Sequence, residues 1–219
     1  MESITGLSRP ALIALAVAVV LGVAASTVAG SIASRGQPGC PDLAYRCATF
    51  KPGEALVLGV LLPETNGPGV EAIRQVVQRY QGSIRGRPVE VESFGSGCTP
   101  EGATNGVREL ATDEPDGPPV IAVIGGACPE AAVPAAQILS DSGITLVLPT
   151  SVDIPPTAGP TRYALRAIPD GEPSSIAAVA DRILRTAGEL AIAAQDGEVL
   201  IPRTPLRDAL ARAFGVPVG

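Results

Sequence analysis

The apolar residues of this chain gather in short uninterrupted runs. The runs at 56–62, 120–124 and 144–148 are almost wholly aliphatic, as expected for strands that are buried on both faces of a parallel sheet. Residues 88–94 instead alternate apolar and acidic positions, which indicates a strand nearer the sheet edge. The pattern therefore predicts a sheet with several fully buried strands.

Amphipathic stretches fill the intervals between these runs. Residues 70–80 place Val70, Ile73, Val76, Val77 and Tyr80 at helical spacing. Residues 100–112, with Thr99 as N-cap, and residues 129–140, with Pro129 in the first turn, are two further predicted helices. The strand-helix alternation predicts an α/β fold, a parallel sheet with helices on both faces.

The pattern weakens after residue 148. The predicted elements there are a Pro/Thr/Gly loop at 149–161, a short strand at 163–168, one long helix at 174–194 whose middle Gly188 weakens, a strand at 198–201, and a last helix that has Pro205 at its first position and ends at Phe214.

The N-terminal segment predicts export. Residues 11–34 carry no charge, and residues 11–30 match the roughly 20 residues that cross a bilayer as a helix. Arg9 and the small residues at 27–29 also suit a cleaved signal. We expect residues 1–36 to be a signal peptide or a membrane anchor, residues 37–54 to be a linker, and residues 55–219 to fold outside the cytoplasm.

Charge and composition exclude several functions. The net charge of −6 gives no source for the counterion release that drives nucleic-acid binding. The absence of His removes the usual general base and the imidazole metal ligands. Gly95, Gly97 and Gly102 loosely resemble a dinucleotide fingerprint, but the last glycine is misplaced and the strand before them is the second. We expect no enzymatic activity, no cofactor and no nucleic-acid partner.

The four cysteines, Cys40, Cys47, Cys98 and Cys128, include no C-x-x-C pair, and the chain has no His to complete a zinc site. In an exported protein they predict disulfides, for which three pairings exist. Cys98 follows a strand and Cys128 begins the next strand-to-helix turn. Local pairing therefore favours Cys98 with Cys128 and Cys40 with Cys47.

Six short motifs within residues 58–151 resemble, in order and spacing, the N-terminal lobe of the Leu/Ile/Val-type periplasmic binding proteins of ABC transporters. They are LGVLLP at 58–63, RGRPVE at 85–90, VIGGAC at 123–128, AAQILS at 135–140, SGI at 142–144 and LPTS at 148–151. In that family a cysteine pair lies where Cys98 and Cys128 stand.

The resemblance implies a single lobe of the type I periplasmic-binding-protein fold. Its core would be residues 55–170. Residues 201–210 resemble a segment that follows the second lobe in full-length relatives, so residues 171–219 would return to complete the first lobe. We therefore expect the second lobe to be missing.

The resemblance also implies a ligand site at the carboxyl ends of the strands. The loops concerned are residues 64–68, 125–130 and 149–153, and the residues expected to touch a ligand are Ala127, Cys128, Pro129, Thr150 and Ser151. Pro129 stands where the family has Ser, and Val152 where it has Thr. We expect weak binding of an amino acid, with an ABC permease as partner.

Two functions remain open on this basis. The first is a solute-binding component of amino-acid ABC transport. The second is a protein-interaction or sensing module that uses the same half-clamp, and in which a homodimer formed through the exposed inter-lobe face would restore a two-walled cleft.

Overall fold

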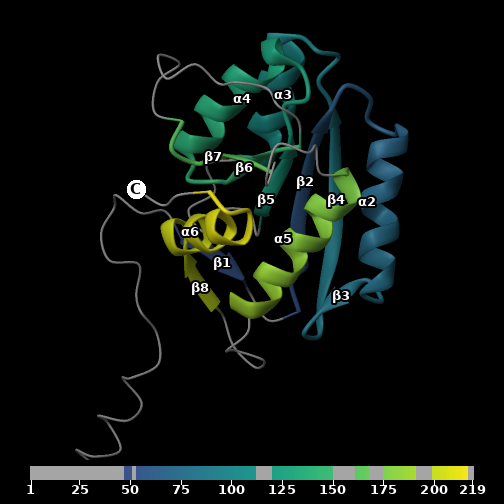
Figure 1. Ribbon diagram of the computed structural model, residues 1–219, viewed down its shortest axis with the longest axis vertical. Coiled ribbons are helices and arrows are strands. Elements are labelled where there is room, and N and C mark those ends of the chain that lie inside the picture. The colour runs from purple at the N-terminus through teal and green to yellow at the C-terminus, as the bar shows by residue number, and fades with distance from the viewer. Residues whose placement is uncertain are drawn as a thin grey trace, which may run out of the picture. The chain divides into compact units, whose positions relative to one another are not determined.

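The computed structural model describes residues 47–50, 53–111, 120–149, 161–167, 175–190 and 199–216. All of them belong to one compact unit, Gly39–Gly219 (Figure 1). In chain order the elements are β1 (Cys47–Phe50), β2 (Leu56–Leu62), α2 (Pro68–Arg79), β3 (Ser83–Ile84), β4 (Arg87–Gly95), α3 (Pro100–Leu110), β5 (Val120–Gly125), α4 (Pro129–Asp141), β6 (Leu146–Leu148), β7 (Ala164–Arg166), α5 (Ile176–Leu190), β8 (Val199–Pro202) and α6 (Arg203–Ala213).

The main sheet has six strands in the order β3-β4-β2-β5-β6-β7. Every pairing from β4 to β7 is parallel, and β3 alone runs antiparallel to its neighbour β4. All residues of β2 and of β5 are buried, as the continuous apolar runs predict. The predicted parallel sheet, with the alternating strand β4 toward one edge, is confirmed.

Helices cover both faces of this sheet, as predicted. Because successive side chains of a strand point to opposite faces, β2 sends Leu58 and Val60 toward the core under α2, α5 and α6, and Val57 and Leu61 toward the core under α3 and α4. Figure 1 shows α5 and α6 on one side of the sheet, with α2 beside α5. The sheet is thus the middle of three layers.

Proline marks the start of each helix that follows a strand in the first part of the chain. Pro68, Pro100 and Pro129 each open their helix, where the missing N–H breaks no helical hydrogen bond. Thr99 caps α3 as predicted, since its side chain accepts a hydrogen bond from the Gly102 N–H at 3.0 Å. These three starts lie at the same edge of the sheet.

The structure departs from the sequence prediction at the hairpin between β3 and β4. A two-residue turn, Arg85-Gly86, with φ of +52° and +82°, connects the strands. Positive φ at both turn residues is typical of the tight hairpin turn that fits the twist of a two-stranded ribbon. With only two residues, β3 is too short to leave a periodic pattern in the sequence.

Three further boundaries differ from the predicted ones. Strand β1 lies inside the range assigned to the linker and pairs antiparallel with β8. Helix α6 begins at Arg203, so Pro205 is the third helical residue, a position whose N–H has no intrahelical partner in any helix. Helix α5 begins at Ile176 rather than at residue 174; Gly188 lies in its last described turn, and residues 191–194 of the predicted helix lie outside the described residues.

No helix in the described part of the chain is long and apolar enough to span a bilayer. The predicted signal or anchor, residues 1–36, lies outside the described residues.

Candidate functional site

The strand order places a topological switch point at the carboxyl ends of β2 and β5. These strands are neighbours, yet the loop after β2 leads to α2 on one face and the loop after β5 leads to α4 on the other. Where two such loops diverge in a doubly wound sheet, ligands bind between them. Residues 63–67 and 126–128 form the two sides of this point, which we call the switch point.

Glycines bring the two strands into close contact at the switch point. The Gly126 N–H donates a hydrogen bond to the Leu61 carbonyl oxygen at 3.2 Å. A Cβ atom on Gly125 would clash with that same oxygen, and one on Gly126, where φ is +70°, would lie 2.8 Å from Leu148. The GG pair of the sequence motif therefore has a steric reason in this fold.

A disulfide joins two of the loops at this edge. Cys98, in the loop between β4 and α3, is bonded to Cys128, the N-cap residue of α4, with their Cα atoms 5.4 Å apart. The predicted pairing of these two cysteines is confirmed. The other predicted pair includes Cys40, which lies outside the described residues.

The β4–α3 loop has an unusual backbone that the sequence analysis did not assign to the site. Gly97 and Cys98 both have φ of +55°, a conformation that costs Cys98 roughly 1 kcal/mol or more. Ser96 is buried; its carbonyl accepts from the Thr99 N–H at 3.0 Å and its hydroxyl from the Cys98 N–H at 3.3 Å. The disulfide and Ser96 together stabilise this turn. The G-S-G-C run at residues 95–98 is the sequence signal from which the turn could be predicted.

The same loop removes the structural basis for a dinucleotide fingerprint. It follows β4, whereas β2 is the strand at the switch point. A Cβ atom on Gly102 would clash with the Ser96 carbonyl oxygen, so this glycine serves loop packing.

Helix α4 points its N-terminus at the switch point. The Cys128 carbonyl accepts from the Ala131 and Ala132 N–H groups at 3.1 and 2.9 Å, which begins the helix. Ala127 and Cys128 are half-buried, and Pro129 is exposed. The positive end of the helix dipole thus lies where a ligand carboxylate would be favoured.

The polar groups at this helix start are few. The sulfur of Cys128 is committed to the disulfide, and Pro129 has no N–H to donate. The exposed Glu130 in the first turn of α4 opposes an anionic ligand. Thr150 and Ser151, the other two predicted site residues, lie outside the described residues. Among the described residues, no group of three His, Cys, Asp or Glu side chains could hold a metal ion.

Among known proteins, the chain is similar to solved structures only. No family model matches the chain, and no curated protein matches it. Among solved structures, it matches the leucine-binding protein LivK of Thermotoga maritima at 19% identity and a TM-score of 0.40, over 52% of this chain and 32% of that one. LivJ of Streptococcus pneumoniae, solved with isoleucine, matches at 19% identity and a TM-score of 0.41, over 52% and 33%.

An ABC transporter substrate-binding protein of Desulfitobacterium hafniense, solved with Leu, matches at 20% identity and a TM-score of 0.43, over 75% of this chain and 49% of that one. The chain thus spans about a third to a half of the length of these structures.

Proposed function

We propose that this chain is an extracytoplasmic, solute-binding-protein-like lobe associated with amino-acid ABC transport, and that it binds a branched-chain amino acid weakly. The observation that supports it is the switch point between β2 and β5, where the N-terminus of α4 lies in the motif that carries the resemblance. Open α/β sheets bind their ligands at this place.

In this proposal, the ligand carboxylate lies at the start of α4, near Ala127, Cys128 and Pro129. Backbone N–H groups and the helix dipole favour it there. Glu64, exposed on the loop after β2, is the carboxylate that we expect to meet the ligand ammonium. Thr150 and Ser151 follow β6 in sequence and complete the proposed contacts.

We expect this lobe by itself to bind weakly. One lobe leaves a side of the ligand in water, so less apolar surface is buried than in a closed clamp. Pro129 and Val152 replace two hydroxyls expected from the family, each worth about 0.5 to 1.5 kcal/mol, or up to about 3 kcal/mol to a charged group. We expect a dissociation constant for Leu, Ile or Val no better than about 1 mM.

Isothermal titration of the monomeric chain with a panel of amino acids tests this proposal. Ala127→Glu places a second carboxylate at the α4 start and should abolish binding, whereas Ala178→Glu, on the exposed face of α5, should leave it unchanged. Micromolar binding by the monomer would contradict the weak-binding proposal. The absence of saturable binding by any amino acid would contradict the ligand class.

The second candidate, a protein-interaction or sensing module, rests on the same open edge. If the chain forms a homodimer through this edge, two lobes would enclose a ligand between them. Micromolar binding that appears only with dimer formation, followed by titration at increasing protein concentration and by sedimentation, would favour this candidate.

The extracytoplasmic location and the permease partner depend on residues 1–36 acting as a signal or anchor. A reporter enzyme that works only outside the cytoplasm, fused after residue 54, should be active. Activity of a cytoplasm-only reporter at the same fusion point would contradict this location.

A further inference from the structure

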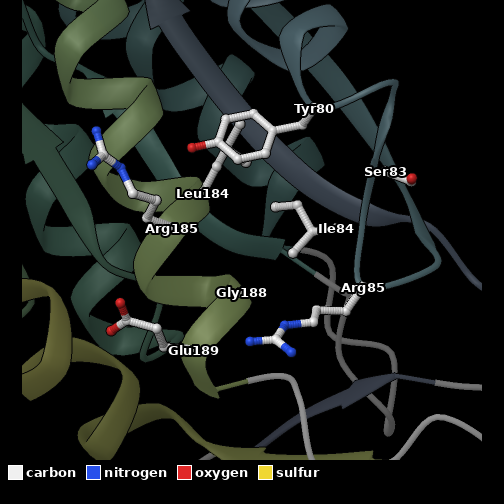
Figure 2. A pocket seen from close by; sticks show the side chains of 8 residues that line it. All are labelled: Tyr80, Ser83, Ile84, Arg85, Leu184, Arg185, Gly188 and Glu189. Atoms are coloured by element: carbon white, nitrogen blue, oxygen red, sulfur yellow. The ribbon is translucent and has the colours of Figure 1, made fainter.

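A hollow lies at the end of the sheet opposite the switch point. It measures about 330 Å³ and lies between the β3–β4 hairpin and the last turns of α5 (Figure 2). We call it the hairpin pocket; its lining residues are Tyr80, Ser83, Ile84, Arg85, Leu184, Arg185, Gly188 and Glu189. Its volume is at the lower end of the range of small-molecule sites.

The hairpin pocket is separate from the switch point. It adjoins the start of β4, whereas the loop with Cys98 follows the end of this strand. Nine strand residues extend over roughly 27 to 30 Å. A ligand in the hairpin pocket would therefore not reach the proposed amino-acid site.

The floor of the pocket is apolar, and Gly188 leaves the space above it unfilled. Ile84 is 6% exposed and Leu184 is fully buried. A Cβ atom on Gly188 would lie 3.1 Å from the Ile84 side chain. Glycine within a helix costs about 0.5 to 1 kcal/mol relative to alanine. Because Gly188 has no side chain, α5 can approach the hairpin and space remains above Ile84.

The rim carries two guanidinium groups. Arg185 forms an ion pair with Asp181, which also accepts a hydrogen bond from the Tyr80 hydroxyl at 2.9 Å. The Arg85 side chain makes no hydrogen bond or ion pair within the part of the chain that the structure describes. Figure 2 shows it extending from the hairpin toward α5. Arg85 thus presents an uncommitted cation beside the apolar floor.

One carboxylate, that of Glu189, also lines the pocket. Glu189 is exposed, and Figure 2 shows its carboxylate projecting from α5 away from Arg85. Because Asp181 already neutralises Arg185, Arg85 is the cation of the pocket rim that can meet an anion, in a chain whose net charge is −6. Within an acidic protein this is a local site for an anion.

We propose that the hairpin pocket binds a small organic carboxylate with a compact aliphatic body. The Arg85 guanidinium pairs with the carboxylate, for which its planar fork of N–H donors is suited. The aliphatic body packs on Ile84 and Leu184 over Gly188. Glu189 weakens the binding by repulsion.

Methyl NMR of the full-length chain, titrated with 3-methylbutanoate, tests this proposal. The methyl signals of Ile84 and Leu184 should shift and saturate with a dissociation constant of about 1 mM, and those of Ala127 and Ala131 report separately on any binding of this carboxylate at the switch point. Inorganic phosphate, which has no apolar body, and isobutylamine, which carries the opposite charge, should each bind at least about tenfold more weakly.

Variants separate the named contacts. Arg85→Ala should weaken 3-methylbutanoate about tenfold, and Glu189→Gln should strengthen it about twofold. Arg108→Ala removes a matched exposed arginine on α3 and should change nothing. Unchanged binding in Arg85→Ala, or shifts confined to the switch point, would overturn the proposal. Weaker binding in Glu189→Gln would overturn it too, because a carboxylate at Arg85 should bind more tightly once the negative charge of Glu189 is removed.

Discussion

The two helical layers are attached to the sheet in different ways. Helices α3 and α4 come from one continuous stretch, residues 98–141, and their buried faces consist largely of small residues: Ala103, Gly106, Ala131, Ala132, Ala135 and Ala136. Helices α2, α5 and α6 come from distant parts of the chain and pack through large aliphatic side chains such as Ile73, Ile183 and Leu210.

The two layers differ in the contacts that hold their helices to the sheet. Small residues let α3 and α4 lie close to the sheet: a Cβ atom on Gly106 would be 2.8 Å from Phe94, and one on Gly59 would be 2.8 Å from Leu110. The Cys98–Cys128 bond then joins the starts of both helices. On the other face no covalent link exists among the described residues, and long-range packing and polar contacts hold the helices.

The largest effect that we predict is on the disulfide. Replacing both Cys98 and Cys128 by Ser should lower the free energy of unfolding by about 3 to 4 kcal/mol, because the bond closes a loop across a sequence separation of 30 residues. Urea denaturation measures this. In reductant the wild-type chain and the variant should unfold at the same midpoint, and this comparison excludes any contribution of the predicted Cys40–Cys47 bond. Equal midpoints for oxidised wild type and variant would contradict the prediction.

Overpacking the α3–α4 layer should have the next largest effect. Ala135→Leu adds volume at a fully buried position of α4 and should cost about 1 to 3 kcal/mol of stability. The control is Ala178→Leu on the exposed side of α5, which should stay within about 0.5 kcal/mol of wild type. If both substitutions proved neutral in urea denaturation, the close packing of this layer would be disproved.

The polar link between α2 and α5 should be weaker. Tyr80→Phe removes the hydroxyl that donates to Asp181 at 2.9 Å and should lower stability by about 1 kcal/mol. A double-mutant cycle with Asp181→Ala isolates the pair, because the loss should disappear when Asp181 is already absent. Additive losses from the two changes would show that the hydrogen bond contributes nothing.

The smallest effect concerns pH. Burial raises the pKa of Asp181, but the hydrogen bonds from Arg185 and Tyr80 outweigh burial and hold this pKa below its usual value. A lowered folded-state pKa gives stability that is present above the unfolded-state pKa and is lost as the pH falls through the folded-state value. Thermal unfolding should therefore show a loss below about pH 4. This loss should be smaller in Asp181→Asn; identical pH profiles would contradict it.

The sequence by itself determined most of the first half of the fold. The buried runs of β2 and β5, the helical spacing of α2, the proline at the start of each helix and the cap at Thr99 act over a few residues, so they can be seen in the pattern. The Cys98–Cys128 pairing was also foreseen, because the strand ends that carry it are adjacent in a parallel sheet.

Only the tertiary structure decided the rest, because the interactions concerned join segments that are distant in sequence. Strand β1 pairs with β8, and no periodicity in residues 47–50 indicates a partner about 150 residues later. The hairpin pocket needs Arg85 and Gly188 to meet, and the left-handed turn at Cys98 depends on its contacts with Ser96 and Cys128. Local patterns encode elements, whereas hollows and strained turns arise from how the elements pack.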